Sequence, residues 1–203
     1  MAKNVLIIAT RYDAGSARTF QWAEDLHGQL LRYADNCLLA DVTGLCRAGS
    51  SLHDLIEIAT HVVFYGHGER DRWLALPGTS TASTLVDGNT VSLLNQRTVY
   101  AGCCLSLSGL GQVFQSTCTG DYIGYNAQFG FDDDNEVEFR RIVNQSVINL
   151  VAGIPPSQVV SDLKQEWASL SQSFTLGHLR KRPNAVQAGH LADLNSQRIG
   201  KTP

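Results

Sequence analysis

Short apolar runs alternate with amphipathic segments along most of this chain, and this alternation restricts its fold more than any other feature. The first run, Val5–Ala9, is apolar at every position, which is typical of a strand covered on both faces. The segment 16–34 then carries apolar side chains at helical spacing. Further strands are predicted at 37–42, 62–66, 98–102 and 121–126, and further helices at 51–59, 136–152 and 157–174. This order predicts an α/β fold with a mainly parallel central sheet and helices on both faces.

The composition restricts the class of protein further. Of the 203 residues, 43% are apolar and 17% are charged, as expected for one globular domain. No apolar run is long enough to cross a membrane, and the first residues lead into a strand rather than a signal peptide. The five cysteines include no CxxC pair, so no metal or other cofactor is expected. We therefore expect a cytoplasmic protein without a membrane partner.

Charge is distributed unevenly along the chain. The formal net charge is -3, yet the segment 178–203 holds three arginines and two lysines against one acidic residue, Asp193. Nucleic-acid binding is usually marked by a basic face on the folded domain, and here the basic residues lie in a polar C-terminal segment. We therefore expect no nucleic-acid partner. We interpret 1–177 as the folded domain and 178–203 as a solvated basic tail.

Two chemically capable side chains follow consecutive predicted strands. His67 follows the strand 62–66, and Cys103 follows the strand 98–102. Adjacent parallel strands lie about 5 Å apart, so the imidazole can reach the thiol at their carboxyl ends. An imidazole that accepts the thiol proton creates a nucleophile, and the amides of Gly68 and Cys103 could hold an oxyanion. The plainer alternatives are a hydrogen-bonded structural histidine and an inert buried cysteine.

This pattern resembles the caspase-like cysteine peptidases, which include caspases, gingipains and separase, and especially the bacterial CHAT peptidases. In that group one apolar strand ends in His-Gly, here 67–68, and the next ends in a small residue followed by the nucleophile, here Cys103. The segments 73–76, 85–88 and 91–94 are similar to the small antiparallel segment and short helix that CHAT domains carry before the cysteine strand. The resemblance covers roughly residues 3–175. It implies a three-layer caspase-like sandwich with a mainly parallel central sheet flanked by helices.

The resemblance also implies an activity, that of a cysteine endopeptidase that cleaves a protein or peptide substrate through a thioester. In that mechanism His67 is the general base and acid, Cys103 is the nucleophile, and the Gly68 amide contributes to the oxyanion hole. No cofactor is implied, and regulation by a protein partner or a signal is expected. Cys104 follows Cys103 directly, so aligning the family motif one residue later would make Cys104 the nucleophile. The strand-end pattern favours Cys103. The alternatives are an inert caspase-like binding module and a redox protein using the adjacent cysteines.

Charged residues beyond the strand ends are candidates for substrate recognition. In this family specificity comes from loops after the first strand and around the nucleophile. Here these loops carry Arg11, Asp13 and the aspartates 132–134. Arg11 would suit an acidic residue before the scissile bond, whereas Asp13 or Asp132 would suit arginine or lysine. The aspartates also precede a helix, where carboxylates act as caps. One cap needs only one side chain, so at least one of the aspartates 132–134 could face the substrate instead. We therefore predict that Asp132 binds a basic substrate residue and that cleavage follows arginine or lysine.

Overall fold

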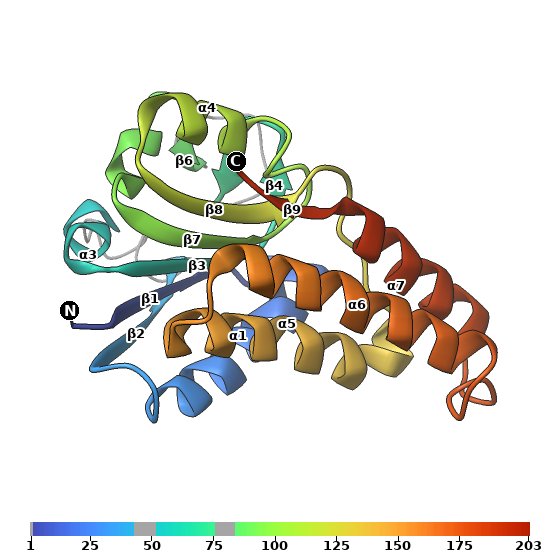
Figure 1. Cartoon of the computed structure of the whole chain (residues 1–203). Coiled ribbons are helices and arrows are strands. Elements are labelled where there is room, and N and C mark those ends of the chain that lie inside the picture. Colours follow the sequence, from blue (N-terminus) through green and yellow to red (C-terminus); the bar gives the residue numbers. More distant parts are fainter. Residues whose placement is uncertain (1, 43–51, 76–83) are drawn as a thin grey trace.

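A six-stranded sheet forms the middle layer of the computed structural model, which describes residues 2–42, 52–75 and 84–203 (Figure 1). The strand order is β2-β1-β3-β7-β8-β9, and all pairs are parallel except β8 with β9. The strands are β1 (Asn4–Ala9), β2 (Asn36–Asp41), β3 (His61–Tyr65), β7 (Arg97–Gly102), β8 (Gly120–Tyr125) and β9 (Ile199–Lys201). The mainly parallel sheet predicted from the sequence is therefore confirmed.

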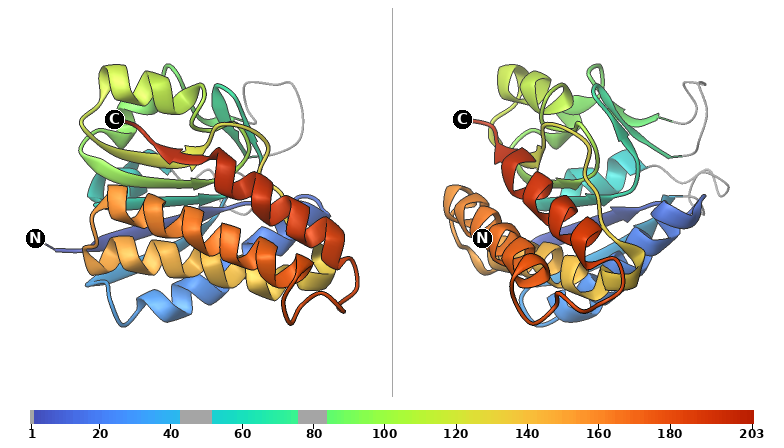
Figure 2. Two further views of the ribbon diagram at one scale, coloured as in Figure 1. Left: turned by 45° about the vertical axis from the view of Figure 1, so that its right-hand side comes forward. Right: turned by 90° about the vertical axis from the view of Figure 1, so that its right-hand side faces the viewer.

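Helices cover both faces of this sheet (Figure 2). One face packs on α1 (Ala14–Leu30), α5 (Glu136–Ala152) and α6 (Pro156–Thr175), and the other on α3 (Leu52–Ile58), α4 (Leu110–Thr117) and the 3-10 helix η2 (Val91–Leu94). The alternation of side chains along each strand supplies both cores. In β1, Val5 and Ile7 belong to the first core, whereas Leu6 and Ile8 belong to the second. This is the expected three-layer sandwich.

A small antiparallel sheet is inserted between β3 and β7. It consists of β4 (Gly68–Glu69), β5 (Arg72–Leu74) and β6 (Thr84–Asp87). Trp73 anchors it, because its ring stacks on Phe64 with centroids 4.7 Å apart and its Nε1 donates to the Tyr122 hydroxyl at 3.1 Å. The antiparallel segment and short helix expected before the cysteine strand are therefore present. The insertion ties the chain just after His67 to the core.

The prediction of a solvated tail at 178–203 is wrong. The segment forms α7 (Ala185–Arg198), which packs along α6, and β9, which extends the central sheet. Gly189 permits the close helix contact, since a Cβ there would meet side-chain atoms of Phe174 and Thr175 at 3.2 Å. The buried face of α7 consists mainly of small residues, Ala185, Ala188, Gly189 and Ala192. Alanine and glycine contribute little to hydrophobic periodicity, so the sequence pattern did not reveal this helix.

Smaller differences concern the ends of elements. The first helix was predicted from Ser16 to Ala34. It starts earlier, at Ala14, because Asp13 is its N-cap, and it ends earlier, at Leu30. Ser51, the first residue of the next predicted helix at 51–59, lies outside the described residues, as does Cys46, one of the five cysteines. Within the described ranges, no helix combines the length and apolar character needed to span a bilayer.

Candidate active site

His67 and Cys103 emerge from the same edge of the sheet. Strands β3 and β7 are neighbours, and Tyr65 is in register with Gly102, one residue before Cys103. The segment carrying His67 then packs directly on the thiol, because a Cβ added to Gly68 would lie 2.6 Å from the Cys103 Sγ. The juxtaposition of the two strand ends, expected from the order of the strands, is therefore present in the structure.

The imidazole of His67 is held by Asp13. Its Nε2 lies 2.9 Å from the Asp13 Oδ2, and its ring centroid lies 5.4 Å from that of Tyr12. Asp13 is itself fixed as the N-cap of α1, because the Ser16 amide donates to its Oδ1 at 2.8 Å and the Ser16 hydroxyl accepts from its amide at 3.0 Å. Sequence reasoning missed this contact and assigned Asp13 to substrate binding. No local signal could have revealed it, since the two residues lie on different strand-end loops.

Local electrostatics keep Asp13 ionised. Partial burial opposes ionisation, but the backbone and side-chain bonds from Ser16 and the nearby His67 outweigh it, so the pKa of Asp13 is lowered. The amino end of α1 adds a positive partial charge at the same place. The ionised carboxylate can therefore hold and orient the imidazole of His67.

The two adjacent cysteines lie in different surroundings. Cys103 is 1% exposed and belongs to the core on the α4 side of the sheet. Burial, together with the neighbouring Cys104, raises the pKa of the Cys103 thiol well above its usual value, and a bond involving Ser106 opposes this only in part. Cys104 is less buried, and its Sγ donates to the Phe129 carbonyl at 3.7 Å. The Cys103 thiol is thus protonated at neutral pH in this conformation.

The other residues predicted for substrate binding have structural partners. Arg11 pairs with Asp41 and lies over the Phe20 ring, 4.9 Å from its centroid. Asp132 is 5% exposed and accepts a hydrogen bond from the Asn135 side chain at 2.7 Å. Its neighbours Asp133 and Asp134 lie near Arg18 and Asn184, respectively. Among the described residues, Asp13 is the carboxylate that forms an ion pair with His67.

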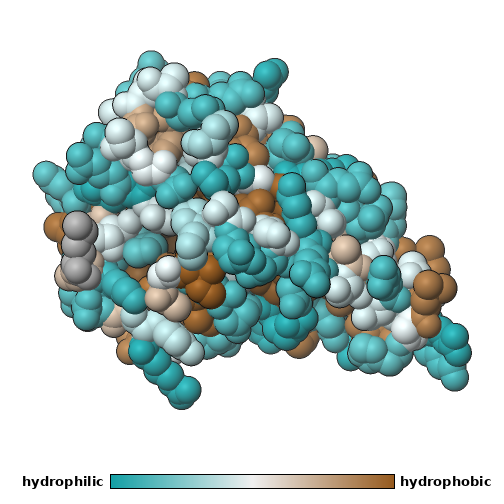
Figure 3. Space-filling view, viewed as in Figure 1, coloured by the Kyte–Doolittle hydropathy of each residue, from teal (hydrophilic) through white to brown (hydrophobic). Residues whose placement is uncertain are grey.

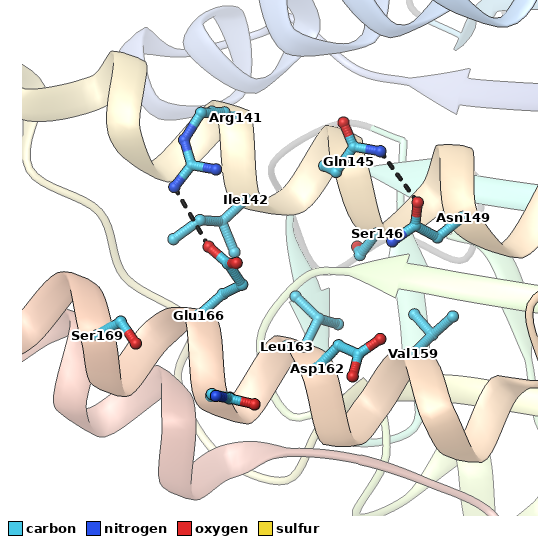
Figure 4. A pocket seen from close by; sticks show the side chains of 11 residues that line it. Arg141, Ile142, Gln145, Ser146, Asn149, Val159, Asp162, Leu163, Glu166 and Ser169 are labelled. Atoms are coloured by element: carbon cyan, nitrogen blue, oxygen red, sulfur yellow. Dashed lines mark hydrogen bonds and ion pairs between the residues drawn. The ribbon is translucent and has the colours of Figure 1, made fainter.

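A pocket of about 290 Å³ lies between α5 and α6, away from His67 and Cys103. Arg141 pairs there with Glu166 at 3.3 Å, and Gln145 donates to Asn149 at 3.0 Å (Figure 4). The described residues also contain no cluster of His, Cys, Asp or Glu suited to a metal ion.

A parallel sheet between two helical layers, with an antiparallel insertion between the histidine and cysteine strand ends, defines a caspase-like α/β fold. Two solved structures are similar to this chain. The complex of Porphyromonas gingivalis RgpB pro- and mature domains matches 97% of this chain and 46% of that chain, with 12% identity and a TM-score of 0.52. The Arg-specific cysteine proteinase gingipain R (RgpB) matches 70% of this chain and 36% of that chain, with 15% identity and a TM-score of 0.48.

The chain thus spans less than half the length of either gingipain structure. Neither a protein-family model nor a curated protein matches the sequence significantly. The likeness to the RgpB complex, at 12% identity, establishes the caspase-like fold and nothing further.

Proposed function

We propose that this protein is a cysteine endopeptidase with Cys103 as the nucleophile and His67 as the general base and acid. The observation that carries the proposal is the packing of Gly68 on the Cys103 thiol at the carboxyl edge of a caspase-like sheet. The Cys103 Sγ attacks the peptide carbonyl while its proton passes to His67, and the amides of Gly68 and Cys103 hold the oxyanion. His67 then protonates the leaving amine, and water hydrolyses the thioester.

Asp13 acts in this proposal as a positioning residue. Its carboxylate contacts the Nε2 of His67, which leaves Nδ1 to accept the thiol proton. A carboxylate in this place fixes the ring orientation and stabilises the imidazolium that forms during attack.

The buried thiol supports regulation by a partner. With Cys103 only 1% exposed, a peptide carbonyl can reach its Sγ only if the segment around Gly68 moves. We propose that a protein partner or the substrate itself displaces this segment, which exposes the thiol and lowers its pKa. The similar RgpB structure is a complex of the pro- and mature domains of that protein.

The second candidate function is a catalytically inert caspase-like binding module, and the same burial of Cys103 favours it. A peptide library incubated with the wild type and with Cys103→Ala separates the two functions, with cut sites detected by mass spectrometry. Cuts that depend on Cys103 support the peptidase. An uncut library, together with a Cys103 that resists peptidyl vinyl sulfone probes at neutral pH, would establish the inert module.

Thiol alkylation provides an independent prediction. Because the pKa of Cys103 is raised, its thiolate fraction at neutral pH is small, and iodoacetamide should modify it more slowly than the less buried Cys104. The rate at Cys103 should rise as the pH passes the ordinary thiol pKa of about 8.5 and goes higher. Residue-resolved mass spectrometry after timed quenching measures both rates.

A peptidyl vinyl sulfone, whose peptide part can displace the segment around Gly68, should modify Cys103 at neutral pH faster than iodoacetamide does, and His67→Ala should slow this modification. Modification at an unchanged rate in His67→Ala would contradict the proposed dyad. Rapid modification of Cys103 in the free wild type at pH 7 would contradict the closed resting conformation.

Substrate preference gives a further prediction. We propose that cleavage follows arginine or lysine and that Asp132 binds that side chain, since a buried carboxylate gains most from a basic partner. Asp132→Asn should then remove the basic preference from a peptide-library profile. Asp133→Asn is the matched control, because this neighbouring carboxylate is 76% exposed. A wild-type preference for aspartate or glutamate would instead assign recognition to Arg11.

A further inference from the structure

The segment 176–186, here called the connector, runs from the end of α6 into the first turn of α7 and presents the two most exposed large apolar side chains of the described residues. Leu176 is 80% exposed and Val186 is 82% exposed. The connector lies at the end of the molecule toward which the parallel strands run, and it projects beyond the sheet (Figures 1 and 2). Apolar atoms gather beside hydrophilic ones at this end of the surface (Figure 3). Exposing two aliphatic side chains to water is unfavourable, and these two do not contribute to the core.

Cations lie between these two side chains in the sequence. Arg180, Lys181 and Arg182 are all exposed. Arg182 is compensated by Glu138. No carboxylate of the described residues forms an ion pair with Arg180 or Lys181, and the nearby Asp134 contacts the connector through Asn184 instead. These two cations therefore have no direct acidic partner among the described residues.

The connector is anchored on the helices that it joins. The Gly177 amide donates to the Gln172 carbonyl at 3.0 Å, and the Leu179 amide donates to the Ser173 carbonyl at 3.1 Å. Leu179 is 5% exposed and Ala185 is 6% exposed, so apolar contacts hold the connector near both of its ends. The backbone that carries Leu176, Val186 and the exposed cations is therefore fixed on the surface.

We propose that this connector docks on an anionic membrane surface. Leu176 and Val186 would enter the boundary between headgroups and acyl chains, while Arg180 and Lys181 would contact anionic headgroups. A nucleic acid would use the cations but gain nothing from two exposed aliphatic side chains, which is why the observations favour lipid. We expected no membrane partner from the sequence because no segment can span a bilayer, but peripheral docking needs no spanning segment. This inference goes beyond the proposed peptidase activity and does not depend on it.

The test is co-flotation of the full chain with vesicles. We expect binding to vesicles of phosphatidylcholine that contain phosphatidylglycerol and much weaker binding to phosphatidylcholine alone. Each cation near an anionic surface contributes a factor of about five, so Arg180→Gln with Lys181→Gln should weaken binding at least about tenfold. Leu176→Asn with Val186→Asn should weaken binding by a similar factor, because the apolar contribution is lost.

The matched control changes an exposed leucine and arginine elsewhere, Leu31→Asn with Arg32→Gln at the end of α1, and should leave vesicle binding unchanged. Failure of the wild type to float with anionic vesicles would overturn the proposal, as would an equal loss in the control. Binding of duplex DNA that is unaffected by the Leu176 and Val186 substitutions, without vesicle binding, would assign the connector to a nucleic acid. Melting temperatures of all variants show whether each one is folded.

Discussion

Cys103→Ala is expected to abolish peptide hydrolysis, and His67→Ala is expected to do the same. Each loss should reach about 10⁴-fold or more in kcat, because the nucleophile and its base act as one unit. For the same reason the double variant should be scarcely worse than either single variant. The measurement is the cleavage rate of a peptide identified in the library screen, with circular dichroism and thermal melting to establish that each variant is folded.

Cys104→Ala is the matched control for the nucleophile. It removes a neighbouring thiol that lies against Phe129 rather than beneath Gly68, and it should retain most of the activity. Activity in Cys103→Ala with loss in Cys104→Ala would move the nucleophile by one residue. Full activity in both variants would exclude cysteine catalysis.

The second large effect is expected for Asp13→Asn. Asparagine caps a helix about as well as aspartate, so the start of α1 should be kept, and the melting temperature at neutral pH should fall only by the stability that the Asp13 charge contributes. The negative charge beside the His67 Nε2 is lost, however, and kcat should fall about a hundredfold or more. Asp133→Asn, which removes an exposed carboxylate on another loop, should leave kcat unchanged.

The pH dependence of stability distinguishes Asp13 from a passive cap. Because its pKa is lowered in the folded protein, Asp13 contributes stability that is present above its unfolded pKa and lost as the pH falls through its folded pKa. Asp13→Asn should therefore show a smaller loss of melting temperature in acid than the wild type. Equal acid sensitivity, together with unchanged kcat, would refute the positioning role of this carboxylate.

The order of the strands and helices could be predicted from the sequence because hydrophobic periodicity is a local property. Val5–Ala9 and 136–152 carry their patterns within one segment, and the structure reproduces both within one residue. Parallel pairing of successive strands then brings their carboxyl ends together by topology alone. This is why the meeting of His67 and Cys103 at one edge could be expected without coordinates.

Three features were decided only by the tertiary structure. The pairing of Asp13 with His67 depends on how two loops converge, and the burial of Cys103 depends on how Gly68 packs above it. The third feature is the C-terminal helix and strand at 185–201, whose small residues are buried only because α6 and β8 are there to receive them. Local patterns in the sequence therefore determined which elements form and where the reactive side chains emerge. Contacts between segments distant in the chain determined the orientation of the imidazole, the protonation of the thiol and the extent of the sheet. The reason is that charge pairing and desolvation depend on neighbours in space rather than in sequence.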